Sequence, residues 1–499
     1  MKKHLILALL IAVMADMYPV KIKIDQKDKT KEPIILQAIL DTGFGIVGVN
    51  DGVGVTDYQS YFIKTAFHIN DFGIGLDFTI RFKIFSLEPE FRFRDWYIEG
   101  DPLATVFLYL DRIDYIRYGN AQSPIFFTTG KIPYTTFGSG TLVNNFHNNF
   151  FVPINKENGA YFRLDGEYFE KYKIKNIPIN FTFFCPDLLD PDIFGFDFNI
   201  NPLGFAKFKD IFKLSLGVTF MSDLDTFERN RLSALKGQYF QSHRNFHVNG
   251  FSSALISGSV PISFVYFKKD YVKVSVIDEV AFAYNGANPS DPDKSDFGIA
   301  NNLEVEARFL NVKNSGLLLG LSSGFIVQGK DFFINYFSSN YQIVRQKQYS
   351  GQSEDYNLYV SAGFGLYALN DNLHFKFKIL MPLITDVFKS KYAMEFRLSE
   401  FAVKGLTIDV FYETGCTDLH ISGSNGGHFL ESITENFRFY AEVSYKIYSA
   451  KISFIIGLQT PGWIVEEDYL PPENPNEFYI ERYGADIQKF VGVGVSFVL

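Results

Sequence analysis

Residues 72 to 84 alternate strictly between apolar side chains and polar or small ones, and this pattern constrains the fold more than any other feature of the chain. Seven apolar residues occupy every second position from Phe72 to Ile84, and glycine, aspartate, threonine, arginine and lysine stand between them. Side chains alternate across a strand with a period of two, whereas one face of a helix repeats every 3.6 residues. The segment is therefore predicted to be a β-strand with one apolar face.

The same alternation recurs along the chain, in residues 61–69, 303–309, 373–381, 392–398, 406–412, 437–445, 450–456 and 491–499. Asn70-Asp71 and Tyr448-Ser449 separate neighbouring runs and are predicted to be tight turns. Longer polar segments are predicted to be loops: Asn285 to Ser295, Gly415 to Gly427 and Trp463 to Glu477. Short connections at one rim and long ones at the other are typical of a transmembrane barrel.

The run at 491–499 has one apolar face that no later segment covers, formed by Val491, Val493, Val495, Phe497 and Leu499. An uncovered edge strand invites pairing with other chains. In a membrane barrel, lipid covers such a face and the first strand pairs with the edge. The run is therefore expected to close a barrel.

The first residues have the layout of a secretory signal peptide. Lys2 and Lys3 precede an apolar run at residues 5–13, and small residues lead to Ala15. The run is too short for a membrane helix, which needs about 20 residues. We predict a signal peptide at residues 1–15 that is cleaved after Ala15, a charged periplasmic arm at 16–35 and a single barrel domain at 36–499.

Composition agrees with export to a membrane. Phenylalanine, tyrosine and tryptophan make up 17% of the 499 residues, and the mean hydropathy is near zero, so apolar residues are interleaved with polar ones as a barrel wall requires. The formal charge of −9 argues against nucleic-acid binding. We predict an all-β fold, a transmembrane antiparallel β-barrel of about 14 strands within a range of 12 to 18, in the bacterial outer membrane. The alternative is a soluble two-sheet sandwich.

The end of the chain resembles the assembly signal of bacterial outer-membrane barrel proteins, with Gly494, Phe497 and Leu499 at the matching positions. The resemblance implies that the barrel-assembly machinery recognises this strand. The sequence departs from the signal at Leu499, which is not aromatic, and at Gly492, where a polar residue is usual.

Residues 111–149 resemble a segment of an uncharacterised outer-membrane family found in spirochaetes and other bacteria with two membranes. The matching residues are Tyr115-Ile116-Arg117-Tyr118-Gly119, Thr136, Gly138, Gly140 and Asn148. Ser123 replaces an aspartate that the family has before Pro124. The resemblance implies a porin-like barrel and no particular activity. Without it, the two glycines would indicate only a bend or a close approach of the backbone.

The positions that alternate with the apolar face are expected to line the lumen. They carry both signs of charge, in Asp77, Arg81, Lys83, Glu304, Glu306, Arg308, His374, Lys376, Lys378, Glu395, Arg397, Asp409, Glu413, Arg438, Glu442 and Lys446. Isolated charges in a dry interior are costly, so the lumen is expected to hold water. We predict a porin-like channel for passive passage of small polar solutes. Neither sign dominates, and no ion selectivity is predicted. The same charges could instead pair and brace a plugged barrel, and a transporter for fatty-acid-type substrates would need a more apolar lumen.

Two further functions stay open beside the channel. His420 and Ser422 share one face if their segment is a strand, as in a lipid hydrolase, with Glu431 or Glu435 orienting the histidine. The long loops would suit a surface adhesion or structural protein. No catalytic residue is assigned, because glycines around residues 423–427 indicate a loop.

The remaining motifs are weaker. Asp41-Thr42-Gly43 resembles the aspartic-protease triplet, but these enzymes need two carboxylates and a turn at a strand edge is expected instead. Histidine and cysteine spacings in two loops, Cys416, His420 and His428 in one and His243 and His247 in the other, match no recognised metal site. No metal and no cofactor is expected. Whether Cys185 pairs with Cys416, and whether the barrel is a monomer or a trimer, stay open.

Overall fold

The structure is a computed structural model. It describes residues 22–24, 34–50, 55–83, 90–97, 102–110, 112–120, 123–144, 146–148, 158–166, 179–188, 191, 193–205, 212–224, 255–268, 272–285, 296–310, 318–329, 337–338, 357–368, 373–383, 391–399, 403–414, 437–459 and 488–498. The predicted signal peptide at 1–15 and the loops at 286–295, 415–427 and 463–477 lie outside these residues.

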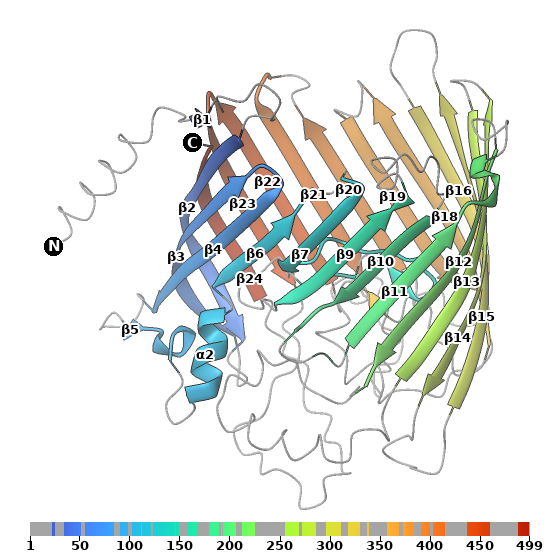
Figure 1. Cartoon of the computed structure of the whole chain (residues 1–499), viewed down its shortest axis with the longest axis horizontal. Helices are drawn as coiled ribbons and strands as arrows, with labels where there is room; N and C mark the ends of the chain where they lie inside the picture. Colours follow the sequence, from blue (N-terminus) through green and yellow to red (C-terminus); the bar gives the residue numbers. More distant parts are fainter. Residues whose placement is uncertain are drawn as a thin grey trace, which may run out of the picture.

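Twenty antiparallel strands form a closed barrel (Figure 1). β24 pairs with both β23 and β2, with Ile39 opposite Val498 and Val47 opposite Phe490, so the last strand closes the barrel as expected. The strands are β2 (Ile34–Asn50), β3 (Val55–Ile69), β4 (Phe72–Lys83), β6 (Ile113–Tyr118), β7 (Ile125–Gly130), β9 (Gly159–Asp165), β10 (Ile179–Cys185), β11 (Ile193–Ile200), β12 (Phe212–Asp223), β13 (Leu255–Lys268), β14 (Val272–Asn285), β15 (Asp296–Leu310), β16 (Leu318–Gln328), β18 (Asn357–Ala368), β19 (Leu373–Pro382), β20 (Lys391–Ser399), β21 (Leu406–Thr414), β22 (Phe437–Ile447), β23 (Ala450–Gln459) and β24 (Gln488–Val498).

The fold class is confirmed, but the prediction of about 14 strands, with 18 as its upper limit, is wrong. The strands from β6 to β11 have only 6 to 8 residues each, shorter than the ten assumed for the estimate. Several strands from β7 to β12 also carry apolar residues on their inner face, where Phe126, Tyr161, Phe184 and Met221 are buried. With apolar residues on both faces, the alternation that reveals a strand in the sequence is lost.

The connections differ between the two rims of the barrel. Two-residue turns join β3 to β4 and β22 to β23, as predicted, and their first residues Asn70 and Tyr448 have φ values of 52° and 53°. Positive φ at this position is typical of the turns that match the twist of a hairpin. The opposite rim carries the longer connections, including those that span residues 84–112 and 131–158.

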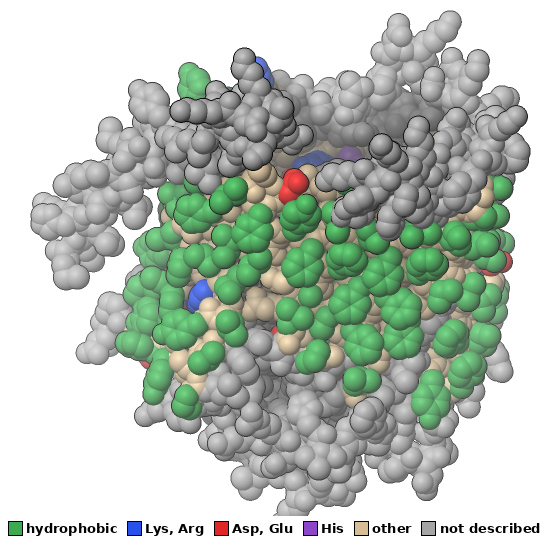
Figure 2. All heavy atoms as spheres, viewed as in Figure 1, with side chains coloured by type: hydrophobic (Ala, Val, Ile, Leu, Met, Phe, Trp, Pro, Cys, Tyr) green, Lys and Arg blue, Asp and Glu red, His purple; other side chains and the backbone are tan. Residues whose placement is uncertain are grey.

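The outer face of the barrel is an apolar belt (Figure 2). Large apolar side chains are exposed on widely separated strands, among them Phe44, Phe67, Ile299 and Phe325. A closed barrel satisfies every backbone hydrogen bond of its wall, and an apolar outer band suits lipid, so this architecture spans a bilayer. Separately, no helix in the described part of the chain has the length and hydropathy to cross a membrane.

A small module lies at the rim with the long connections, between β4 and β6 (Figure 1). It consists of β5 (Glu90–Phe91), η1 (Phe93–Asp95) and α2 (Pro102–Leu110). Asp95 accepts a 2.8 Å bond from Arg81 of β4 and a second bond from Arg92, while Arg112 bonds its carbonyl oxygen. Burial alone would raise the pKa of Asp95, but Arg81, Arg92 and Arg112 outweigh it and hold that pKa below its usual value.

Two short elements lie beside the barrel. β1 (Ile22–Ile24), in the predicted periplasmic arm, pairs antiparallel with the start of β2, and η3 (Pro202–Phe205) follows β11. The barrel strand β2 begins at Ile34, two residues before the predicted domain start.

Candidate functional site

Residues 131–144 and 146–148, here called the lumen segment, turn into the barrel after β7. Ile132, Phe137, Leu142, Val143 and Phe146 are buried there against inward-facing side chains of the wall. Those wall residues include Phe184 of β10, Met221 of β12, Ala281 of β14 and Tyr359 of β18. Within the segment, β8 (Val143–Asn144) pairs with β17 (Phe337–Ser338), which comes from the connection between β16 and β18. The segment therefore fills one side of the lumen with a packed apolar core.

The lumen segment is fixed to the wall at Glu279 of β14, a fully buried carboxylate. Its Oε2 accepts the backbone N–H of Ser139 at 2.8 Å, the hydroxyl of Ser139, and the hydroxyl of Thr141 at 3.0 Å. Asn302 of β15 donates to the same two hydroxyl oxygens, at 2.7 and 3.0 Å. Three donors converging on one carboxylate satisfy its buried charge and orient the loop.

The glycines at 138 and 140, which the sequence analysis singled out, belong to this anchor. Gly138 and Gly140 have φ values of 55° and 88°, a region that L-residues with a side chain rarely adopt. A Cβ at Gly138 would lie 2.7 Å from Oε1 of Glu279. The turn therefore needs glycine both for its conformation and for the approach of the carboxylate.

Asn148 holds the two ends of the lumen segment together. Its Oδ1 accepts the N–H of Ile132 at 2.8 Å, and its Nδ2 donates to the carbonyls of Gly130 and Pro186 at 2.8 and 2.9 Å. Asn148 thus returns the chain to the wall where β7 ends, which explains in physical terms why an asparagine suits this position.

Tyr115 and Arg117, from the first part of the same sequence motif, meet His68 of β3 on the inner face. The tyrosine hydroxyl lies 2.7 Å from Nε2 of His68, and Nη2 of Arg117 lies 3.1 Å from the same nitrogen. Gly73 and Gly75 of β4 leave room for the two rings, because a Cβ at either position would lie within 2.6 Å of them. This cluster braces the wall next to the lumen segment.

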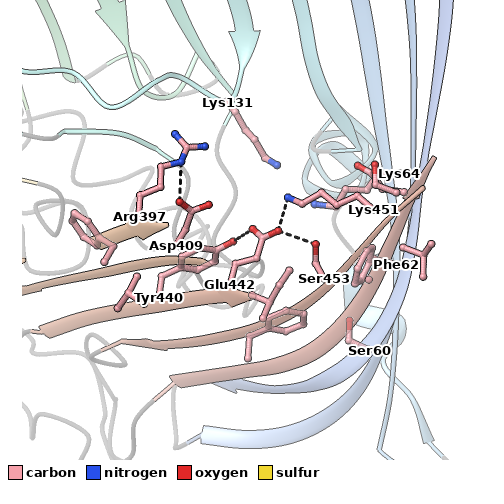
Figure 3. Close-up of a pocket in the computed structure, with 18 of the residues that line it drawn as sticks. Ser60, Phe62, Lys64, Lys131, Arg397, Asp409, Tyr440, Glu442, Lys451 and Ser453 are labelled. Atoms are coloured by element: carbon pink, nitrogen blue, oxygen red, sulfur yellow. Dashed lines mark hydrogen bonds and ion pairs between the residues drawn. The ribbon is translucent and has the colours of Figure 1, made fainter. Parts of the chain in front are cut away.

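A cavity of about 800 Å³ remains on the other side of the lumen, between the lumen segment and the wall formed by β2–β4 and β20–β24 (Figure 3). The lumen segment contributes Lys131 and Tyr134 to its lining, and Tyr134 lies 6.2 Å from Phe411 of β21 between ring centroids. The wall contributes charged residues of both signs: Asp41, Lys64, Glu395, Arg397, Asp409, Glu442 and Lys451. Charges in such number require water in the cavity.

Glu442 of β22 is the centre of a hydrogen-bonded group in this cavity (Figure 3). Its Oε1 accepts bonds from Lys451 at 2.6 Å and Ser453 at 2.8 Å, and its Oε2 accepts one from Tyr440 at 2.6 Å. Arg397 of β20 pairs with Asp409 of β21 at 3.1 Å. The side chains come from neighbouring strands and point to the same face, so the wall presents a fixed pattern of charges and hydroxyls.

Four of the predicted lumen residues line this cavity: Glu395, Arg397, Asp409 and Glu442. Asp77 lies behind Lys64, at 3.2 Å from its ammonium, and Arg81 turns to Asp95 at the rim. Lys376 lies 3.4 Å from Glu395.

The other predicted lumen residues lie away from the cavity. Lys378 of β19 reaches Glu304 of β15 at 2.9 Å, and Arg308 pairs with Glu306 of its own strand at 2.8 Å. His374 lies 3.8 Å from Glu395. Glu413 is buried, Lys83 and Lys446 are exposed, and the side chain of Arg438 lies outside the described part of the structure.

Three lysines of the cavity were missed by the sequence analysis. Lys64 and Lys451 occupy the inward positions of two alternating runs that were identified, so applying the same rule to 61–69 and 450–456 would have found them. Lys131 follows β7 in an irregular segment, where periodicity gives no signal.

The motif Asp41-Thr42-Gly43 lies in the middle of β2 and not at a strand-edge turn as expected. A Cβ at Gly43 would lie 2.3 Å from the carbonyl of Val493, so this glycine permits close contact between β2 and β24. Asp41 lines the cavity.

Several other predicted residues lie outside the described part of the chain: His420, Ser422, Glu431, Glu435, Cys416, His428, His243, His247 and Leu499. Among the described residues, no group of three metal-ligating side chains is brought together. The thiol of Cys185 is buried and donates to the carbonyl of Asp187 at 3.3 Å. Gly494 lines the cavity and Phe497 is buried in β24.

No protein family model matches the chain, and no curated protein sequence matches it significantly. Solved structures to which this chain is similar include the copper transporter OprC, at 9% identity over 93% of this chain and 81% of that one, with a TM-score of 0.39. They also include OpdL of Pseudomonas aeruginosa (8% identity, 93% and 98% covered, TM-score 0.32) and OmpT of Vibrio cholerae (7% identity, 94% and 98% covered, TM-score 0.30). At these TM-scores the likeness supports no conclusion, and the fold of this chain rests on its own strand pairing.

Proposed function

We propose that this protein is a porin-like channel of the bacterial outer membrane, through which small polar solutes pass by diffusion. In this proposal the chain is exported with a cleaved signal peptide at residues 1–15. The barrel-assembly machinery inserts it by way of Gly494, Phe497 and Leu499. The membrane lipid contacts the apolar belt.

The observation that carries the proposal is the cavity of about 800 Å³ beside the lumen segment. Among the described residues, the lumen segment packs on one side of the barrel and the cavity lies on the other, which supports a water-filled path beside a packed half. The charges of Arg397, Asp409 and Glu442 favour polar solutes over fatty-acid-type substrates, since burying an apolar chain against them would leave the charges poorly solvated. Charged side chains at a constriction are also how pores select solutes.

Conductance of the purified barrel in planar lipid bilayers tests this proposal. We expect stepwise increases in current when a potential of either sign is applied. A second measurement, swelling of liposomes in small sugars, should show permeation that falls as solute size increases. A folded barrel that never opens and never passes solute would contradict the proposal.

The lipid-hydrolase and adhesion alternatives stay predictions, because His420, Ser422 and the long loops lie outside the described residues. Lipase activity that disappears in Ser422→Ala would favour the hydrolase over the channel.

A further inference from the structure

In the ion pairs at the cavity, the two partners differ in the exposed fraction of their side chains. In the pair between Lys64 and Asp77, 26% of the lysine side chain is exposed but only 10% of the aspartate. In the pair between Lys451 and Glu442 the values are 44% and 15%. In each pair, the lysine side chain is more exposed than the carboxylate side chain.

The same order holds on the lumen segment and on β20. The Lys131 side chain is about twice as exposed as that of its partner Asp114, and Arg397 is more exposed than Asp409. Lys64, Lys131, Arg397 and Lys451 all line the cavity, whereas Asp77 and Asp114 do not. Figure 3 shows Lys131 and Lys451 extending into the open space from opposite sides.

Of the two remaining carboxylates of the lining, one is recessed and one is not. Oδ1 of Asp41 is buried. Glu395 is exposed at 45% of its side chain, and its partner Lys376, 3.4 Å away and exposed at 47%, does not line the cavity. In four ion pairs the cation is therefore the more exposed partner, and the interaction energy of charges falls with distance. The four cations and four carboxylates of the lining balance in number.

We propose that the cavity is selective for small anions. This preference comes from the greater exposure of the cation in each ion pair and not from the net charge of the lining. The solutes would carry carboxylate or phosphate groups, which lysine ammonium and arginine guanidinium groups bind. Hydroxyls of Ser60 and Ser496 also line the cavity and can donate to such groups. The proposal rests on the channel function described above.

The sharpest test removes one pair without changing the net charge. In the variant Lys451→Gln with Glu442→Gln, the cavity loses the more exposed cation and the less exposed anion of one pair together. Reversal potentials in a potassium chloride gradient should show that the wild-type barrel prefers chloride. The ratio of chloride to potassium permeability should fall about twofold in the variant, because the carboxylate offsets part of the effect that the lysine alone would have through water.

The matched control is Lys489→Gln with Asp57→Asn. This pair lies outside the cavity lining, and its two side chains are exposed to nearly equal extents. Its removal should leave the permeability ratio unchanged. A wild-type barrel that prefers potassium or neither ion, or a double variant with the wild-type ratio, would overturn the proposal.

Calorimetric titration of the purified barrel separates this proposal from the channel function. Potassium succinate should bind, 1,4-diaminobutane should not, and the affinity for succinate should fall in Lys451→Gln with Glu442→Gln. Succinate binding to a barrel that does not conduct would refute the channel and leave the anion site standing. A conducting barrel that binds the diamine in preference to succinate would refute the anion site alone.

Discussion

Carboxylates on the inner faces of β14 and β22 have opposite surroundings within one barrel. Glu279 of β14 is fully buried under the lumen segment and accepts three hydrogen bonds from Ser139 and Thr141. Glu442 of β22 lies at the edge of a water-filled cavity, paired with Lys451. The comparison teaches that wall strands with the same alternation can serve either as a scaffold for packing or as the lining of a cavity. What covers the inner face decides between the two.

The filled half should carry more of the stability than the wet half. Phe146 is fully buried and packs 5.2 Å from Phe184 between ring centroids. Phe146→Ala should lower the free energy of unfolding by about 3–5 kcal/mol, the usual cost of deleting a buried aromatic ring. Urea unfolding of the barrel in lipid vesicles measures it. The matched variant in the wet half is Phe411→Ala, which should cost clearly less, and equal losses would break the distinction between the halves.

Removing the anchor of the lumen segment should affect both stability and pore size. Glu279→Ala deletes the acceptor of three hydrogen bonds and should cost about 3 kcal/mol, since bonds to charged groups contribute roughly 1.5–3 kcal/mol each and the freed donors regain water in part. Single-channel conductance should rise because the segment can leave the lumen. Glu306→Ala, on the inner face of β15 without contact to the segment, serves as control. Unchanged conductance in Glu279→Ala would show that the segment does not limit the pore.

At the rim, protonation of Asp95 in acid should destabilise only the module around η1. Because the folded-state pKa of Asp95 is lowered, its contribution is complete above the ordinary aspartate pKa of about 3.9 and is lost as the pH falls through the lowered value. Hydrogen exchange in residues 90–97 should therefore accelerate in acid beyond the intrinsic change. Asp95→Asn should show fast exchange at neutral pH with no such transition. A transition that persists in the variant would assign it to another group.

The smallest effect is expected from an exposed ion pair of the wet half. Arg397→Ala removes the partner of Asp409 in a setting open to water, where such pairs contribute about 0–1 kcal/mol. Unfolding in urea should be nearly unchanged, whereas the chloride permeability should fall. A large loss of stability would mean that the cavity pairs brace the wall.

The alternation of apolar and polar residues predicted several of the wall strands whose inner face is polar. The runs at 72–84, 406–412 and 450–456 correspond to β4, β21 and β23, and the terminal run pairs with β2 as expected. In the five barrel strands from β7 to β12, apolar residues on the inner face pack on the lumen segment, so the period of two was hidden and the strand number was underestimated.

The site was predicted in part for the same reason. Glu395, Arg397, Asp409 and Glu442 lie on regular strands, where their direction follows from the period. The path of the lumen segment depends on contacts such as that between Ser139 and Glu279, which are 140 residues apart. Local sequence patterns carry no information about pairings of that kind. The glycines at 138 and 140 indicated a bend but not which wall residue it would contact.

Accessibility of single cysteines from the pore tests the central claim, that solutes pass through the cavity beside the lumen segment. In a background with Cys185 and Cys416 replaced by alanine, Arg397→Cys places a thiol in the cavity, and Ala281→Cys places one under the lumen segment. A bulky methanethiosulfonate reagent should block most of the single-channel current of the first variant and leave the second unaffected. Current that persists in Arg397→Cys after complete labelling, or equal block in both variants, would contradict the account.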